Sequence, residues 1–108
     1  MKLPEDSVIA TEKITHYLLK WQADNDKSEF LKRAGYAPGK WEYLIRDIRS
    51  QLRGEAEFSR KTAYGNLYKI QGRITGLNGI SLRIVTIRMT EHKSEKTKFI
   101  KLFPDKEV

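Results

Sequence analysis

The hydrophobic pattern of this chain changes its period near Gly54, and this change restricts the possible folds more than any other feature. Before Gly54, apolar residues recur every three or four positions, as on one face of an α-helix. After it, they recur at every second position, as on one face of a β-strand. A chain of 108 residues builds one hydrophobic core, so both halves must share it. We therefore predict a single α+β domain over residues 1–108, with helices packed on one face of a sheet.

Three helices are expected in the first half. Residues 11–21 carry one helical stripe, and a second, short helix begins near Lys27 and ends at Gly35, which suits a left-handed cap. Pro38 fits the first turn of a third helix, whose apolar stripe continues to the stop at Gly54. The side chains expected to be largely buried are those of Trp41, Leu44, Ile48, Ile70 and Ile87.

Four antiparallel strands are expected in the second half, arranged as a meander. Asn78-Gly79 is a strong hairpin signal between the second and third strands. Pro104 ends the last strand, because proline cannot donate to the hydrogen-bond ladder. The strands are predicted over residues 55–61, 67–75, 80–90 and 96–103.

Alternation along the strands assigns side chains to two faces of the sheet. The face expected to meet the helices carries Tyr68, Ile70, Val85, Ile87, Met89, Ile100 and Leu102. The open face is expected to carry Lys69, Gln71, Arg73, Thr86, Arg88, Phe99, Lys101 and Phe103. Cations neutralise phosphates, and exposed rings stack on unpaired bases for about 1–3 kcal/mol each. RNA contacts are therefore predicted at Lys69, Arg73, Arg88 and Phe99, although a solvated face with the phenylalanines turned inward fits the same pattern.

Charge and composition point to a polyanionic partner. Lys and Arg number 21 against 14 Asp and Glu, a net charge of +7, and such a surface attracts RNA or other polyanions by releasing counterions. The absence of cysteine excludes disulfides, thiolate metal sites and cysteine nucleophiles. No apolar run is long enough for a signal sequence or a membrane span, so we expect a cytoplasmic protein without membrane contact.

Known catalytic motifs are missing from the sequence. It has no GxSxG, P-loop, GxGxxG or HExxH pattern, and His16 and His92 are isolated. The carboxylates show no repeated metal-ligand spacing, so neither a metal site nor a cofactor is expected. Cleavage of a phosphodiester would then depend on Lys or Arg to stabilise the phosphorane, with Tyr, Lys or His moving protons. Three arginines on the third helix could follow a phosphate backbone or form ordinary helix ion pairs with Glu42: Arg46, Arg49 and Arg53.

Several longer motifs resemble a small bacterial family catalogued as domain of unknown function 6883. The helical half carries the runs ITHYLLKW, DKSEFLKRAGY and PGKWEYLIRDIRSQL. The strand half carries TAYGNLYKIQGRITGLNG, VTIRMTEH and KTKFIKLFPD, matching the family's YGxxY, GxxTGxNG and closing TKFxTLxPD motifs. The resemblance covers nearly the whole chain and rests on the order and spacing of all these motifs.

This resemblance implies a toxin-like role, because such domains occur in toxins and beside small candidate antitoxin genes. The layout of helices followed by a meander is similar to the barnase–EndoU–colicin–RelE group of metal-independent ribonucleases. The catalytic positions that it implies are Lys27, Tyr64, Tyr68, Thr86, Lys98 and Lys101. The chain departs from the family pattern at Arg88, where tryptophan is usual, and at Lys101, where threonine is usual.

The leading hypothesis is an endoribonuclease-type toxin domain that cleaves RNA without metal and pairs with a small acidic antitoxin. Two other classes of function fit the same residues. One is a nucleic-acid-binding module without activity, and the other is a protein-interaction domain whose basic face docks an acidic partner.

Overall fold

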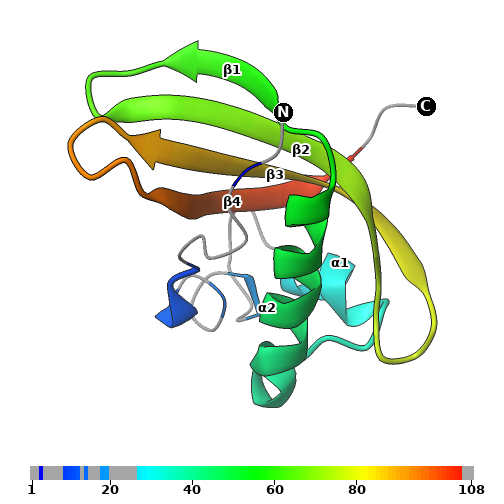
Figure 1. Cartoon of the computed structure of the whole chain (residues 1–108). Helices are drawn as coiled ribbons and strands as arrows, with labels where there is room; N and C mark the ends of the chain where they lie inside the picture. The colour runs from blue at the N-terminus through cyan, green and yellow to red at the C-terminus, as the bar shows by residue number, and fades with distance from the viewer. Residues whose placement is uncertain (1–2, 4–8, 13, 15–17, 20–26, 106–108) are drawn as a thin grey trace.

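A computed structural model describes residues 3, 9–12, 14, 18–19 and 27–105 and shows helices packed against one face of a curved sheet (Figure 1). Its four strands pair as an antiparallel meander in the order β1-β2-β3-β4. This confirms the α+β class and the predicted sheet. The strands are β1 (Glu57–Lys61), β2 (Gly65–Thr75), β3 (Ser81–Glu91) and β4 (Thr97–Pro104).

The helical half is built around α2 (Trp41–Ser50), which runs beneath the sheet (Figure 1). A 3₁₀ turn precedes it over Pro38–Lys40 and another follows over Gln51–Arg53, so the predicted extent of the third helix is confirmed. The second predicted helix is α1 (Ser28–Lys32). The helix expected over residues 11–21 lies largely outside the described residues, so the count of three helices is not confirmed. Within the described ranges, no helix has the length and apolar character needed to cross a membrane.

Gly35 ends the turn after α1 in the left-handed conformation that the sequence predicts, with φ +89°. The Tyr36 N–H donates to the carbonyl of Leu31 at 3.3 Å, and the Gly35 N–H donates to that of Lys32 at 2.9 Å. This pair of bonds satisfies the helix-end carbonyls and turns the chain so that Tyr36 enters the core, where it is 1% exposed.

The hairpin between β2 and β3 turns at Asn78-Gly79, as predicted, and Gly79 has φ +83°. Its tip bends down beside α1 (Figure 1), where the Asn78 side-chain amide donates to the carbonyl of Arg33 at 2.8 Å. The contact is so close that a Cβ added at Gly76 would lie 1.9 Å from the Ala34 carbonyl oxygen. Both glycines are therefore required by backbone geometry.

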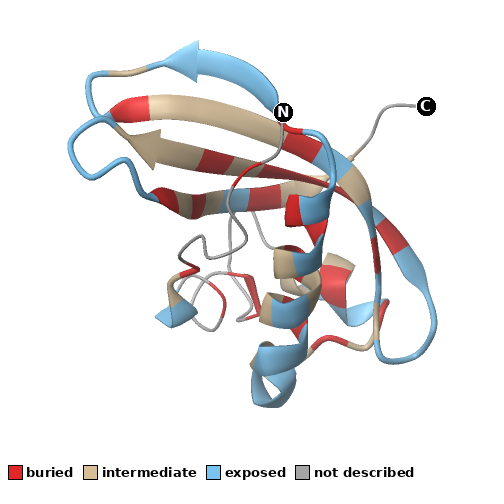
Figure 2. Cartoon of the chain, viewed as in Figure 1, coloured by how far each residue is buried: buried red, intermediate tan, exposed pale blue. Residues whose placement is uncertain are grey.

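The main core lies between α2 and the sheet (Figure 2). Leu44, Ile48 and Ile70 are buried, as predicted. Trp41 and Ile87 are less buried than these three, and Trp41 packs at the margin of the core. Strand residues of this core include Ile74, Leu82, Ile84, Phe99 and Leu102.

The predicted assignment of β3 side chains to faces is wrong. Thr86 pairs with the buried Ile70 and is itself buried, and Arg88 donates to a carbonyl of α2. The even-numbered residues of β3 therefore face the helices, whereas Val85, Ile87 and Met89 lie on the opposite face. Alternation could not reveal this, because β3 has apolar residues at both parities, and Thr86 and Arg88 find hydrogen-bond partners inside the protein.

The register between β3 and β4 shifts after Ile87, so that Arg88 pairs with Phe99 while Ile87 pairs with Lys101. The shift leaves Ile100 as the extra residue and allows both Phe99 and Leu102 to face the helices. The prediction that Phe99 lies on the open face is therefore wrong. Lys101 and Phe103 remain on that face, as predicted.

Candidate nucleic-acid interface

Three transverse rows of side chains cross the open face of the sheet, meaning the face turned away from α2. The strand register sets these rows, because paired residues on neighbouring strands project to the same side. Cationic side chains occupy the two outer rows, and the row between them holds one amide and two apolar side chains. The rows are Lys69, Ile87 and Lys101; Gln71, Val85 and Phe103; and Arg73 with Arg83.

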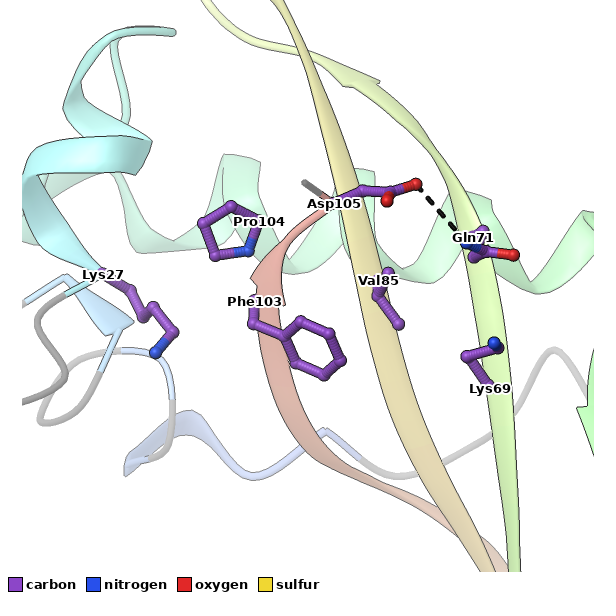
Figure 3. A pocket seen from close by; sticks show the side chains of 7 residues that line it. All are labelled: Lys27, Lys69, Gln71, Val85, Phe103, Pro104 and Asp105. Atoms are coloured by element: carbon purple, nitrogen blue, oxygen red, sulfur yellow. Dashed lines mark hydrogen bonds between the residues drawn. The ribbon is translucent and has the colours of Figure 1, made fainter. Parts of the chain in front are cut away.

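The central row forms the floor of a hollow of about 650 Å³, here called the groove (Figure 3). Val85 is 4% exposed although it lies on the open face, because longer side chains surround it. Lys27 immediately precedes α1 and extends toward Phe103 from beyond the β4 edge (Figure 3). The groove is lined by Lys27, Lys69, Gln71, Val85, Phe103, Pro104 and Asp105.

Two lysines belong to the cationic row beside the groove. The ammonium of Lys101 lies 5.7 Å from the centre of the Phe103 ring, within the range of a cation–π contact. The ammonium of Lys69 lies 3.8 Å from the Glu57 carboxylate. An exposed pair of this kind contributes little to stability and is screened by salt. Lys69 can therefore exchange Glu57 for a phosphate at low cost.

Asp105 is a functional candidate that the sequence analysis missed. It follows β4, and its side chain is 6% exposed, lying 3.9 Å from the guanidinium of Arg83. The Gln71 amide donates to the same carboxylate oxygen at 3.5 Å (Figure 3). The signal was present as the Pro-Asp pair that closes the last motif, although only the structure shows that this pair ends beside the groove.

A second hollow of about 390 Å³ adjoins the groove. It shares Gln71 and Asp105 with the groove, so these two residues form the boundary between the hollows. Its lining brings two guanidinium groups close to the carboxylate. The residues of this second hollow are Gln71, Gly72, Arg73, Arg83 and Asp105.

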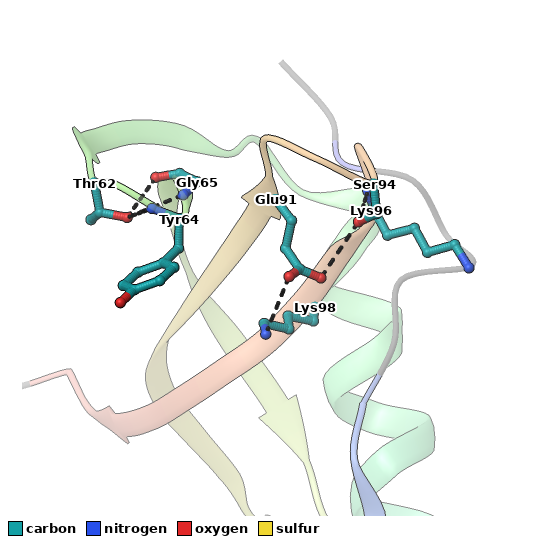
Figure 4. Close-up of polar contacts among 7 residues, drawn as sticks. All are labelled: Thr62, Tyr64, Gly65, Glu91, Ser94, Lys96 and Lys98. Carbon is teal, nitrogen blue, oxygen red and sulfur yellow. Dashed lines mark hydrogen bonds and ion pairs between the residues drawn. The ribbon is translucent and has the colours of Figure 1, made fainter.

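Tyr64 and Lys98 lie at the other end of the sheet, among the turns β1–β2 and β3–β4 (Figure 4). The Thr62 hydroxyl accepts from the backbone N–H groups of Tyr64 at 3.2 Å and Gly65 at 3.1 Å, which fixes the turn. Tyr64 is 78% exposed, and its ring points away from Lys98 (Figure 4). Lys98 instead pairs with Glu91 at 3.7 Å.

Tyr68 and Thr86 lie on the helix side of the sheet. Tyr68 packs beside Ile70, and its ring meets Phe58 edge to face at 6.0 Å between centroids. The buried Thr86 hydroxyl donates to the Gln51 side-chain oxygen at 3.0 Å. The six residues predicted as catalytic are thus divided among three places; of the six, Lys27 lines the groove and Lys101 lies in the row beside it.

Arg88, predicted to contact RNA, is fully buried. Its Nη2 donates to the carbonyl of Ile48 at 2.8 Å, and its Nε contacts the Thr86 hydroxyl at 3.4 Å. Burial, and secondarily the charge of Arg49, lowers the pKa of Arg88 to about 10, so the guanidinium remains charged at neutral pH. Its placement on the open face was wrong because α2 supplies the acceptor that makes burial possible. Of the four predicted RNA contacts, Lys69 and Arg73 lie on the open face.

The three arginines of the third predicted helix form a separate basic surface. Arg46, Arg49 and Arg53 line a hollow of about 330 Å³ together with Ser50. Arg46 contacts the neighbouring Asp47 at 3.1 Å. This surface lies on α2 and its following turn, on the other side of the sheet from the groove.

Of the two histidines, only His92 lies among the described residues, and it does not line the groove. His16 falls outside the described residues, and the exposed His92 ring contacts the carbonyl of Thr62 through Nε2 at 2.9 Å. In the described part of the chain, no three His, Cys, Asp or Glu side chains are grouped as metal ligands would be.

Comparison with known proteins gives a family and a fold. One solved chain matches with a TM-score of 0.74 and 16% sequence identity, covering 92% of this chain and 100% of its own length. It comes from a contact-dependent growth inhibition toxin–immunity protein complex of Klebsiella pneumoniae 342. No curated protein gives a significant match. The profile of one family, the domain of unknown function DUF6883, matches residues 2–106, and the chain therefore belongs to this family.

Proposed function

We propose that this chain is a toxin domain that binds single-stranded RNA in the groove and cleaves it without a metal ion. The observation that carries the proposal is the order of the rows, with an apolar, aromatic floor between cationic edges. A base can lie on the Phe103 ring while phosphates on either side meet Lys69 or Lys101 and Arg73 or Arg83. Stacking and phosphate neutralisation together are the usual way in which proteins hold unpaired RNA.

The cleavage step needs charge stabilisation more than it needs a special nucleophile. In RNA, the ribose 2′-oxygen can attack the adjacent phosphorus, and negative charge grows on the phosphorane oxygens as it does so. The ammonium groups of Lys27 and Lys101 are assigned to these oxygens, where charge-assisted hydrogen bonds strengthen in the transition state. Lys101 replaces the usual threonine of the family and adds a positive charge at this position.

One observation favours a role in a toxin–immunity pair, and a second favours the toxin over its inhibitor. The fold is shared with a chain from a complex that contains both a toxin and an immunity protein. The net charge of +7 suits a domain that acts on RNA and is neutralised by an acidic protein. A small acidic immunity or antitoxin protein is accordingly the proposed protein partner.

The proposal can be tested by incubating the purified chain with total RNA in excess EDTA and following discrete fragments. We expect cleavage that EDTA does not reduce. The double substitution Lys27→Ala and Lys101→Ala should slow it about 100-fold or more, as expected when groups that stabilise the transition state are lost. Lys40→Ala, which removes an exposed lysine beside α2, is the control and should change the rate less than about twofold.

Three results would each contradict part of the proposal. Cleavage abolished by EDTA would contradict metal independence. Equal activity of the groove variant and the control would place the reaction elsewhere on the protein. RNA binding without cleavage under any condition would favour a nucleic-acid-binding module.

A further inference from the structure

The two hollows on the open face meet at a carboxylate. Asp105 and Gln71 line both of them, so a chain that passes from one hollow to the other must cross these two side chains. Asp105 is nearly covered, at 6% exposure, and borders both hollows. A carboxylate placed between cationic groups repels a phosphate but accepts a hydrogen bond from a hydroxyl. The junction thus has the chemistry to receive a ribose hydroxyl.

We propose that Asp105 is the group that takes the proton from the attacking 2′-hydroxyl, and that the two hollows hold the nucleotides on either side of the cleaved bond. This inference rests on the proposed function and identifies its substrate as single-stranded RNA of at least two nucleotides. The groove holds one nucleotide with its base on Phe103. The second hollow holds the 3′-phosphate of the next nucleotide on Arg73 and Arg83.

The spacing of the rows agrees with this arrangement. Lys69 and Arg73 are four residues apart on β2, which corresponds to roughly 13 Å along an extended strand. A dinucleotide with its flanking phosphates bridges this length. Gln71 lies midway between the two cations and holds Asp105 through the 3.5 Å contact. The carboxylate is thereby placed next to the middle of a bound strand.

The reaction balances without another reactant. The 2′-hydroxyl gives its proton to a carboxylate oxygen of Asp105 while the bond from the 2′-oxygen to phosphorus forms. The bond from phosphorus to the 5′-oxygen of the next nucleotide breaks, this oxygen takes a proton from solvent water, and the proton on Asp105 returns to solvent. The products are a 2′,3′-cyclic phosphate and a 5′-hydroxyl. DNA lacks the attacking hydroxyl and is not a substrate.

Asp105 also has a structural contact, because it pairs with Arg83 at 3.9 Å. A purely structural role and the proposed one predict different effects of Asp105→Asn. Asparagine keeps the shape and can still accept from Arg83 and Gln71, but its amide cannot take up a proton at neutral pH. A structural role predicts little change in cleavage, whereas the proposed role predicts a large loss.

The experiment compares wild type, Asp105→Asn and the charge-matched control Glu42→Gln on one fluorescent RNA octamer. We expect Asp105→Asn to lower the cleavage rate about 100-fold or more. Its affinity for the same octamer with 2′-O-methyl groups, which cannot be cleaved, should stay within about threefold of wild type. Glu42 is exposed on α2, and its variant should match wild type in both assays.

The wild-type protein supplies tests that do not depend on any variant. A single 2′-deoxy substitution at the cleaved nucleotide should stop the reaction, and the RNA products should end in 2′,3′-cyclic phosphate. Products with a 3′-hydroxyl and a 5′-phosphate, or full activity of Asp105→Asn, would overturn the role of Asp105 and leave the proposed ribonuclease standing. Absence of any RNA cleavage by wild type would overturn both.

Discussion

Arg88 places a positive charge inside the protein. None of the ion pairs found among the described residues joins it to a carboxylate. The C-terminal end of α2 partly offsets this charge, because Ile48 lies in its last turn and its carbonyl accepts from Arg88. Nη1 of Arg88 and Nε2 of Gln51 are buried and have no hydrogen-bond partner in the described structure. Such a cluster costs stability, since buried donors lose their hydration.

Replacing Arg88 by methionine should therefore stabilise the fold. Methionine has a similar length and removes the buried charge. The two groups that accept from Arg88 each keep another hydrogen-bond partner. The Ile48 carbonyl still accepts from the Gln51 N–H, and the Thr86 hydroxyl still donates to the Gln51 side chain. We expect the free energy of unfolding to rise by about 1–3 kcal/mol in urea denaturation, as for other buried charges replaced by apolar groups. Arg46→Met, an exposed control, should change it by less than about 0.5 kcal/mol. A loss of stability in Arg88→Met would show that its hydrogen bonds outweigh its desolvation.

Tyr36 carries a short hydrogen bond across the helical half. Its hydroxyl donates to the Asp47 carboxylate at 2.6 Å, and its ring is buried. Burial, followed by the hydrogen bond to Asp47, raises the pKa of Tyr36 well above its usual value of 10. The folded state therefore keeps the phenol proton under conditions in which the unfolded state loses it.

Tyr36→Phe should lower the free energy of unfolding by about 1–3 kcal/mol at pH 7, because a hydrogen bond to a charged group is lost. This difference from wild type should stay constant up to about pH 10. Above that pH it should shrink, since the unfolded wild type then releases a proton that the folded state retains. Urea denaturation of both proteins between neutral and alkaline pH measures the difference. A gap that widens as the pH rises would contradict the assigned direction of the pKa shift.

Residue identity predicted the cations of the open face but not the role of Asp105 or Arg88. Lys69 and Arg73 could be placed there because the alternation of β2 was predicted correctly. Lys101 could be placed there because the predicted alternation of β4 holds again after the register shift. The junction at Asp105 depends on where the chain goes after β4 ends. The burial of Arg88 depends on an acceptor 40 residues away in α2. Neither relation is contained in local sequence.

At the scale of elements, the β2–β3 hairpin is held against the residues that follow α1. Gly76 and Asn78 from the hairpin meet the carbonyls of Ala34 and Arg33 just after α1. Contacts with the backbone thus explain Gly76 and Asn78, the second glycine and the asparagine of the GxxTGxNG motif.

Gly76→Ala should test this contact. The new Cβ would lie 1.9 Å from the Ala34 carbonyl oxygen, so the hairpin must move away from α1. We expect the free energy of unfolding to fall by about 2 kcal/mol or more, as for other overpacked sites. Gly39→Ala is the matched control, because its Cβ would have no heavy atom within 4 Å and alanine there reduces only unfolded-state entropy. Equal stability of Gly76→Ala and wild type would mean that the hairpin is not held as described.

The hairpin, the extent of α2 and the four strands could all be predicted from local patterns. Glycine, proline and periodicity mark these elements within a few residues. The register shift at Ile100 could not be predicted, because Phe99 and Leu102 have opposite parity and either can be the inward residue of a regular strand. One extra residue in β4 was enough to move Phe99 from the predicted RNA-binding face into the core.

At the scale of the whole molecule, cations gather around hollows on two surfaces of the described structure. One is the open sheet face with the groove, and the other is the arginine surface of α2. Single-stranded RNA needs stacking as well as charge, and Phe103 gives the groove an aromatic floor. The lining of the α2 hollow consists of Arg46, Arg49, Ser50 and Arg53, and the neighbouring Tyr43 ring is already covered by the Arg46 guanidinium, 5.1 Å from its centre. The groove is therefore the surface assigned to RNA.

The salt dependence of RNA affinity tests this assignment most directly. An uncleavable 2′-O-methyl octamer is titrated at several salt concentrations into wild type, into the groove double variant Lys69→Ala/Arg73→Ala, and into the helix double variant Arg46→Ala/Arg53→Ala. Each phosphate contact on a single strand contributes about −0.7 to the log–log slope. We predict that the groove variant flattens the slope by about 1–1.5 while the helix variant leaves it unchanged. Flattening by the helix variant alone would contradict the central claim and place RNA on α2.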